Sequence, residues 1–493
     1  MLISVISGNL NMFSDLLYLI IFQLLCSVIC IFLKEENAKR GALILSVISF
    51  LFSIHMFFEV RDYGATNYLV DIPWIQQLGI HFKIGMDGIS FLLVQLTNFL
   101  VPLIILSSFN RDIKNQRAFY SLIFLMQFAL NGVFTALDGF LFYIFWELAL
   151  IPIYFICWLW GGKDSVRITL KFFIYTLSGS LLMLVGLIYL YLQTPGEHTF
   201  DINVFYNLQL DSHQQTFIFW TFFLAFAIKM PVFPLHTWQP DTYTDAPTQG
   251  TMLLSGIMLK MGIYGVIRWL IPVVPGAMHE WGTLAIILSV TGIVYASCIA
   301  LVQKDFKRMI AYSSIAHVGL ISAGVLSLTM EGLQGAMYQM ISHGVNVVGL
   351  FFIADILFDR MKTRQLDELG GIANSQRTFS ILFMIILLGS VALPLTNGFI
   401  GEFLLLTGVY KYNAWTALFA GTTVILGAVY MLRSYKAIML GDKVSMGIFT
   451  PLAKEEKTVL IVIAAVVIAT GIYAKPLLDI AEPAVKNILS HIR

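Results

Sequence analysis

The chain has 493 residues, of which 58% are hydrophobic and only 12% are charged, and its formal net charge is +1. A mean hydropathy of +0.81 is typical of an integral membrane protein and excludes a soluble enzyme or a soluble binding module. The near-zero net charge gives no reason to expect nucleic acid as a partner.

Apolar runs long enough to cross a bilayer as helices recur from one end of the chain to the other. They predict about fourteen spans, at 15–33, 41–58, 89–108, 118–136, 138–160, 168–193, 217–238, 250–270, 281–302, 309–328, 334–358, 379–408, 414–434 and 457–474. We expect no cleavable signal peptide, because residues 1–14 contain no basic residue. The predicted fold is an all-α integral membrane protein in a lipid bilayer.

Basic residues alternate from loop to loop along these spans. Most of the 30 lysines and arginines, 21 of them, fall in the loops at one side, which we call the basic side; these six loops begin near Lys34, Arg111, Lys163, Lys304, Arg360 and Arg433. By the positive-inside rule the basic side faces the cytoplasm. Both termini are therefore expected on the opposite, outer side, in the periplasm or its equivalent.

The longest outer loop and the cysteines are interpreted as structural. Between Glu59 and Gly88, two short stretches in which apolar and polar residues alternate, together with turn residues, predict a small β-hairpin that covers the outer face. Cys26 and Cys30 are four residues apart in the first span, but no further metal-ligating residue lies nearby, so packing is the better interpretation. Without a phosphate loop or a dinucleotide fingerprint, we expect no metal and no cofactor in this chain.

The fifth span contains one carboxylate, Glu147, among uncharged residues. An unpaired ionised glutamate in that position is costly, so Glu147 is expected to be protonated or paired with a cation. Lys229 in the seventh span is the candidate partner.

Lys229 stands just before two prolines, Pro231 and Pro234, inside an apolar run. A charged side chain near the bilayer centre costs about 2.5–3.5 kcal/mol on insertion scales, and proline breaks the helical hydrogen bonds. Broken backbone at this depth is tolerated only inside protein or beside a wet cavity. We therefore expect Lys229 to face an internal polar space; the alternative is a kinked helix whose lysine reaches the surface.

The loop after the seventh span has acids and no bases. Asp241 and Asp245 either collect protons at an entrance or lie in a solvated turn. The eighth span then brings a second buried lysine, Lys260, which shares a helix face with Gly256 and Tyr264 at four-residue spacing. The small residue lets a neighbouring helix or water approach the ammonium closely.

Histidines follow in the tenth and eleventh spans. His317 comes four residues after Ser313, which could orient its ring, and His343 lies in a stripe with Gln339 and Asn346. A single histidine on an apolar helix is usually a satisfied core residue. Two on adjacent helices, in a chain with buried lysines and carboxylates, favour a proton relay.

The twelfth span is interrupted at Pro394, and Glu402 follows about two turns later. The seventh and twelfth spans are thus both broken beside an ionisable group, and they lie five helices apart. This spacing predicts two inverted five-helix repeats. The expected organisation is three N-terminal helices and the outer loop (1–117), a first repeat (118–270), a second repeat (281–440), and a C-terminal helix and tail (441–493).

These motifs resemble the antiporter-like subunits of proton-pumping NADH:quinone oxidoreductase, respiratory complex I. The motifs that carry the resemblance are Trp146-Glu147, the segment 227–241, Gly256 through Lys260, Tyr312 through His317, and Gly398 through Glu402. Glu402 indicates the subunit M branch, because the sister subunits L and N and the related Mrp antiporter subunits typically carry lysine at that site. The chain also ends soon after its last span, without the long lateral helix typical of subunit L.

The resemblance implies roles for six residues. Glu147 and Lys229 would form an ion pair, Lys260 would be the central proton carrier, His317 and His343 would be relay groups, and Glu402 would feed the outer half-channel. It also implies subunits L and N as neighbours in the bacterial inner membrane. FMN, iron–sulfur clusters, NADH and quinone would be bound by partner subunits, which perform the redox chemistry.

Two rival functions remain open at this stage. One is a subunit of an Mrp-type cation/proton antiporter without redox coupling. The other is a structural membrane spacer whose charged residues only fix the register of the helices.

Overall fold

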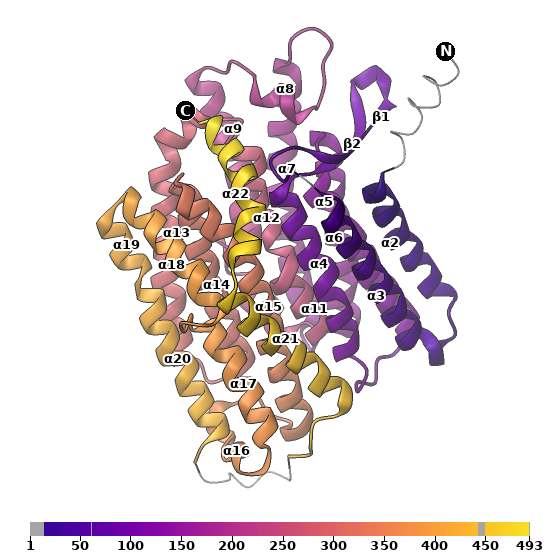
Figure 1. Cartoon of the computed structure of the whole chain (residues 1–493), viewed down its shortest axis with the longest axis vertical. Helices are drawn as coiled ribbons and strands as arrows, with labels where there is room; N and C mark the ends of the chain where they lie inside the picture. The colour runs from indigo at the N-terminus through magenta and orange to yellow at the C-terminus, as the bar shows by residue number, and fades with distance from the viewer. Residues whose placement is uncertain (1–13, 61, 442–448, 493) are drawn as a thin grey trace.

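Helices that run along one common direction form almost the entire molecule, and one small sheet lies at one end (Figure 1). This computed structural model describes residues 14–60, 62–441 and 449–492, so residues 1–13, on which the expectation of no cleavable signal peptide depends, lie outside the described residues. Helices dominate because a backbone in lipid must satisfy its own hydrogen bonds.

The N-terminal part consists of three long helices and the predicted hairpin. Its elements are α2 (Asp15–Phe32), α3 (Glu35–Glu59), β1 (Asn67–Ile75), the 3-10 turn η1 (Gln76–Leu78), β2 (Ile80–Met86) and α4 (Gly88–Ser107). The two strands pair antiparallel, which confirms the hairpin. Asp87 caps α4 by accepting from the backbone N–H groups of Ile89 and Ser90.

The next part contains the first broken helix. Its elements are α5 (Gln116–Thr135), α6 (Gly139–Trp160), α7 (Ser165–Gln193), α8 (Ile202–Tyr206), α9 (Ser212–Lys229), α10 (Gln239–Asp245), α11 (Thr248–Leu253), η2 (Leu254–Met258), α12 (Lys260–Gly265) and η3 (Val266–Leu270). The predicted span 217–238 is wrong at its end, because α9 stops at Lys229, where the prolines begin. The loop expected around Asp241 is instead the short helix α10.

The following part contains the second broken helix. Its elements are α13 (Pro275–Val302), α14 (Phe306–Leu326), α15 (Met330–Met361), η4 (Leu366–Glu368), α16 (Ile372–Ser375), α17 (Arg377–Ser390), α18 (Asn397–Tyr412), α19 (Ala414–Ala420) and α20 (Thr422–Met439). The predicted break is confirmed, since α17 ends at Ser390 and α18 begins at Asn397.

The C-terminal part departs from the expected tail. After α21 (Lys454–Ile472) the chain bends by 68° into a further helix, α22 (Lys475–Ser490). One face of α22 is buried, at Ile480, Ala481, Ala484, Val485 and Ile488. This amphipathic spacing escapes a search for apolar runs, because lysines and acids occupy the other face. In Figure 1, α22 crosses the middle of the bundle and ends at the same end of the molecule as the hairpin.

Within the described part of the chain, eleven helices are long and apolar enough to cross a membrane, or twelve with the bent pair α21–α22. The broken segments α9 and α17–α18 do not pass this test as single helices, so the total of fourteen and the repeat boundaries remain predictions. The eighth span, which contains Lys260, is entirely buried, whereas only 28% of α3 is. The eighth span, α14 and α15, which carry Lys260, His317 and His343, are therefore mostly enclosed by other helices.

Candidate functional site

Five of the six candidate residues are enclosed by protein. Lys229, Lys260, His317, His343 and Glu402 are each at most 5% exposed, and Glu147 is half-buried. The surface alternative for Lys229 is therefore wrong. None of these five side chains faces the lipid.

Lys229 is the last residue of α9, at the first break. Its ammonium lies over the rings of Trp146, at 5.6 Å from the centroid, and Phe172, at 6.0 Å. The helix C-terminus favours a cation there because its free carbonyls are partially negative. The indole N–H of Trp238 donates to the carbonyl of Ile228 at 3.0 Å, so the chain beyond the break folds back to satisfy the end of the helix.

The expected contact between Lys229 and Glu147 is absent. Among the described residues, no ion pair within 4 Å joins them, and Oε1 of Glu147 has no hydrogen-bond partner. Glu147 lies on α6 beside Ser180 of α7, whereas the Lys229 ammonium is held by aromatic faces. The prediction of an ion pair is therefore wrong for this conformation. The two side chains nevertheless interact electrostatically at longer range.

Lys260 lies between two π-helical turns, η2 and η3. Its Nζ donates to the carbonyl of Ser255 at 2.6 Å and to Nδ1 of His343 at 3.1 Å. The wider π-turn changes the backbone pairing around Lys260, and such turns are frequent at functional sites. Lys260 is thus held by a carbonyl and an imidazole, with no carboxylate within ion-pair distance in the described chain.

The second ring nitrogen of His343, Nε2, contacts a different helix from the one that carries Lys260. Nε2 lies 3.1 Å from Oγ of Ser314 on α14. An ammonium only donates, so Nδ1 of His343 accepts from Lys260, and the proton of a neutral ring is then on Nε2. The imidazole therefore joins Lys260 to α14.

His317 lies one turn after Ser314 on α14, between His343 and Glu402, the glutamate at the second break. Its ring centroid lies 6.0 Å from that of His343, and its Nδ1 lies 2.9 Å from Oε1 of Glu402. These two atoms are close without the alignment of a hydrogen bond, since both also lack a hydrogen-bond partner. Lys260, His343, His317 and Glu402 form one connected group.

A small cavity lies beside this group. It is lined by Ile310, Ser313, Ser314, His317, Gln339, His343, Asn346, Val347, Leu350 and Ser390, and its volume of about 10 Å³ is close to the space that one water molecule needs. The predicted stripe of Gln339, His343 and Asn346 thus faces the cavity. Ser313 does not orient His317 as expected, because it instead contacts the hydroxyl of Tyr430 at 3.1 Å.

The glycine before Glu402 has a geometric reason. A Cβ on Gly401 would lie 2.2 Å from Oε1 of Gln339, so only glycine lets α18 approach α15 this closely. The next residue, Glu402, faces His317 of α14. Sequence reasoning missed two polar partners in this region, Tyr430 and Asn397. Tyr430 donates to Ser313. Asn397 accepts a hydrogen bond from the side-chain amide of Asn346 at 3.0 Å, and nothing in its sequence context indicated this role.

The acids of α10 find their bases on other elements. Asp241 lies 3.0 Å from the ammonium of Lys171 and 3.1 Å from the guanidinium of Arg308. Asp245 lines a large cavity at the basic side together with Lys307. Asp241 is therefore part of an ion-pair network, and Asp245 remains the entrance candidate.

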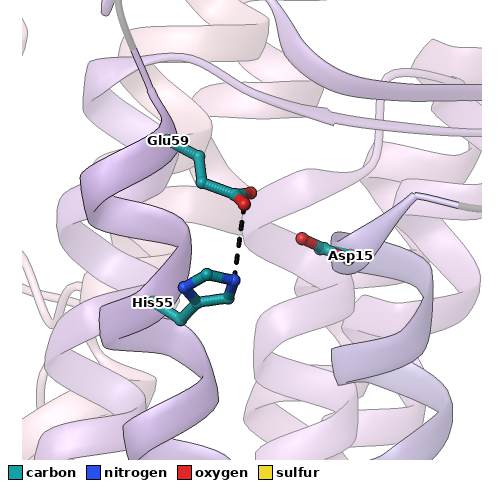
Figure 2. Close-up of side chains that lie close together, drawn as sticks. All are labelled: Asp15, His55 and Glu59. Carbon is teal, nitrogen blue, oxygen red and sulfur yellow. Dashed lines mark ion pairs between the residues drawn. The ribbon is translucent and has the colours of Figure 1, made fainter.

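One group of possible metal ligands occurs in the described residues, and it lies away from these elements. Figure 2 shows His55 and Glu59 of α3 facing Asp15 of α2, with Nε2 of His55 3.3 Å from Oε1 of Glu59. His55 is well exposed, and its spacing from Glu59 is an ordinary i, i+4 pair. The group links the outer ends of α2 and α3.

Comparison with known proteins agrees with this geometry. The family model described as "NADH:quinone oxidoreductase/Mrp antiporter, TM" matches residues 136–427, which include all six candidate residues and both breaks. The chain belongs to this family. A relative from Rhodobacter capsulatus named NADH-quinone oxidoreductase subunit M is 38% identical and covers 93% of this chain and 91% of its own length. The resemblance to the subunit M branch is thereby confirmed.

Solved structures extend the family assignment to the fold. A chain of respiratory complex I from Thermus thermophilus with bound NADH superposes with a TM-score of 0.88 at 28% identity, covering 96% of this chain and 99% of that one. A chain of the Mrp complex from Dietzia sp. DQ12-45-1b gives a TM-score of 0.84 at 18% identity, covering 95% of this chain and 52% of its own. The Mrp likeness shows the shared fold, while the sequence similarity favours the complex I family.

Proposed function

We propose that this multi-pass membrane protein is the antiporter-like subunit M of a proton-pumping NADH:quinone oxidoreductase, and that it moves protons through its buried lysine, histidine and glutamate residues. The observation that carries the proposal is the connected group from Lys260 through His343 and His317 to Glu402. Each member holds or releases protons, and each is buried.

The polar interior supports proton transfer over a purely structural role. A core built only for packing pairs its buried polar groups, because an unpaired one costs about 1–3 kcal/mol. Along this line, polar atoms of Glu147, His317, Gln339, Asn346 and Glu402 have no hydrogen-bond partner in the protein. Such atoms are where water would bridge adjacent groups.

The separation of Glu147 and Lys229 gives the proposed switch. At an effective dielectric constant of about 20, two opposite charges 4 Å apart attract by about 4 kcal/mol. Bringing the carboxylate to Lys229 therefore holds a proton on the lysine, and separating them favours its release toward Lys260. The described conformation corresponds to the separated state, and a neighbouring subunit needs only a modest helix movement to change it.

The setting of this function follows from the same proposal. The basic side faces the cytoplasm, both termini are periplasmic, and the membrane is the bacterial inner membrane. Subunits L and N are the neighbours, and FMN, iron–sulfur clusters, NADH and quinone belong to other subunits. A role in an Mrp-type antiporter is the second candidate, and copurification of the chain without an NADH dehydrogenase would favour it.

The test is proton pumping by the assembled complex in sealed vesicles during NADH oxidation. We expect Lys229→Ala and Glu147→Ala each to lower the pumping rate by about tenfold or more, up to the roughly hundredfold at which the range for lost proton-transfer groups begins. Lys171→Ala is the matched control, because Lys171 is a half-exposed lysine whose partner Asp241 is also bound by Arg308.

Assembly must be measured in parallel, from the amount of complex that retains NADH oxidation with an artificial electron acceptor. Wild-type pumping in both the Lys229→Ala and Glu147→Ala variants would reject the proposed switch.

A further inference from the structure

A large cavity at the basic side is not explained by the six candidate residues. It has a volume of about 680 Å³ and lies between the loop before α5, the loop before α7, α10–α11, and the ends of α14 and α15. Many of its lining residues are titratable or charged: Arg111, Asp112, Lys163, Asp245, Lys307, Asp355, Asp359, Lys362 and Arg364. A cavity of this size and polarity admits water.

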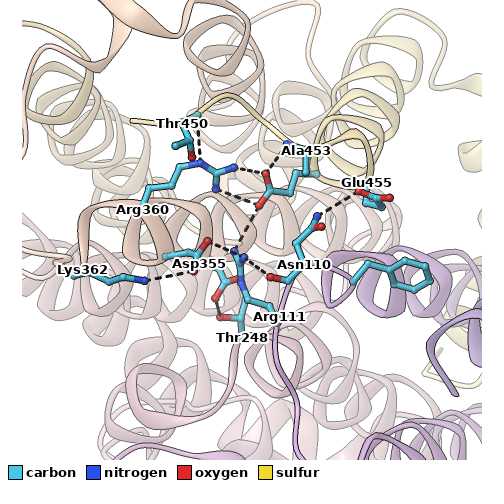
Figure 3. Close-up of polar contacts among 12 residues, drawn as sticks. Asn110, Arg111, Thr248, Asp355, Arg360, Lys362, Thr450, Ala453 and Glu455 are labelled. Atoms are coloured by element: carbon cyan, nitrogen blue, oxygen red, sulfur yellow. Dashed lines mark hydrogen bonds and ion pairs between the residues drawn. The ribbon is translucent and has the colours of Figure 1, made fainter. Parts of the chain in front are cut away.

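Two of the four carboxylates that line it, Asp355 and Asp359, are fixed by Arg111. Figure 3 shows Arg111 beside Asp355, whose two oxygens lie 2.8 Å from Nε of Arg111 and 2.6 Å from the hydroxyl of Thr248. Arg111 also binds Asp359 at 3.0 Å, and Arg360 holds Glu456 with two contacts. This network ties α15 to α21 and to the loop before α5, so it forms a fixed rim.

Lys307 and Asp245 differ from that rim. Lys307 is 5% exposed, and its Nζ donates to the backbone carbonyl of Ala246 at 2.7 Å, with no carboxylate within 4 Å among the described residues. Burial raises the pKa of the neighbouring Asp245, so this carboxyl binds a proton more readily than one in water. Both side chains line the cavity, and within the described residues neither forms an ion pair within 4 Å.

Lys307 also begins the polar face that leads to the histidines. On α14, Lys307, Ser314 and His317 are spaced by seven and three residues, which places them on one side of the helix. Ser314 contacts His343, which contacts Lys260. The same side of α14 therefore borders the basic-side cavity at Lys307 and the small inner cavity at Ser314.

A short apolar layer separates the two cavities. Ile310 of α14 and Val347 and Leu350 of α15 line the inner cavity on the side of the basic end. One turn nearer the basic side on each helix, Lys307 of α14 and Ala354 of α15 line the basic-side cavity. The layer is therefore about 4.5–6 Å thick, from three or four residues at 1.5 Å each.

The neighbouring seam between α15 and the eighth span is closed. A Cβ on Gly256 would lie 2.7 Å from Val348, and one on Gly344 would lie 2.9 Å from the carbonyl of Gly256. Two helices in such close backbone contact leave no room for water between them. Residues of α14 and α15, by contrast, line both the inner cavity and the basic-side cavity.

We propose that the basic-side cavity is the uptake vestibule for protons that reach His343, that Lys307 is its last titratable group, and that Ile310, Val347 and Leu350 form a gate which conducts only when hydrated. This inference rests on the proposed function and adds its entry side. Narrow apolar constrictions are known to close water paths by dewetting.

The first test separates a relay role of Lys307 from a structural one. Arginine keeps the charge and can donate to the carbonyl of Ala246, but it does not release its proton. We expect both Lys307→Met and Lys307→Arg to lower NADH-driven proton pumping by the assembled complex in vesicles by about tenfold. Lys304→Met is the control, because Lys304 is 77% exposed and lies one turn earlier in the chain. Normal pumping by Lys307→Arg would overturn the relay role.

The second test addresses the gate. Ile310→Ala removes side-chain volume from the apolar layer and leaves more room for water there. We therefore expect a severalfold rise in passive proton leak through the assembled complex when a potential is imposed across the vesicle membrane without NADH. Ile315→Ala is the matched control: Ile315 is an equally buried isoleucine of α14, and it packs with Ala296 and Ala316 instead of lining either cavity. Equal leak in both variants would overturn the gate.

Failure of this inference is distinguishable from failure of the proposed function. If Lys229→Ala stops pumping while the two Lys307 variants pump normally, only the vestibule and its last group are rejected. If Lys229→Ala and Glu147→Ala also pump normally, the proposed function itself fails.

Discussion

The two broken helices hold their ionisable groups in opposite ways. At the first break, Lys229 contacts only aromatic rings and lies apart from Glu147. At the second, Glu402 lies 2.9 Å from His317 and is connected through His343 to Lys260. A lysine that lies outside ion-pair distance of its candidate carboxylate depends on a movement to exchange its proton, whereas Glu402 already lies beside a second titratable group. The first half of the molecule therefore resembles a switch, and the second half resembles a path.

The largest expected effect comes from removing the residue that joins the two halves. Lys260→Met deletes the donor to Ser255 and His343, and we expect proton pumping in vesicles to fall by about a hundredfold, at the low end of the range for lost proton-transfer groups. Lys260→Arg should not restore pumping, because arginine stays charged. Strong pumping by Lys260→Met would remove the link between the two halves.

A smaller effect is expected at the second break. Glu402→Gln keeps the shape of the side chain but removes its titration next to His317, so we expect pumping to fall by about tenfold. Glu402→Lys is expected to pump better than Glu402→Gln, because sister subunits typically carry lysine there. A neutral Glu402→Gln variant with wild-type pumping would exclude Glu402 from the path.

The smallest effect tests the aromatic surroundings of Lys229. Trp146→Leu removes a cation–π contact worth about 0.5–2 kcal/mol and leaves an apolar side chain in place. We expect a severalfold drop in pumping, and a weaker drop in Phe172→Leu, because phenylalanine is the poorer partner and lies further away, at 6.0 Å against 5.6 Å. Equal pumping rates in the two variants and the wild type would show that the rings only fill space.

Much of the candidate site could be recognised in the sequence because ionisable residues are rare in apolar runs. Lys229, Lys260 and Glu402 stand out for this reason, and both breaks follow from prolines, whose effect on a helix is local. Lys307 was not singled out, because a lysine near the end of a span is indistinguishable from the other basic residues of its loop. Its role as a candidate appears only when the cavity beside it is seen.

The sequence by itself determined that the chain is an α-helical membrane protein, where most of its spans lie, and that its buried lysines, histidines and glutamates are enclosed by protein. Only the tertiary structure decided which of these groups meet: Glu402 meets His317, Lys260 meets His343, and Glu147 does not reach Lys229. The reason is that hydrophobic burial depends on composition and period, whereas a contact between two polar groups depends on a few ångströms set by the rotation and packing of helices distant in the chain.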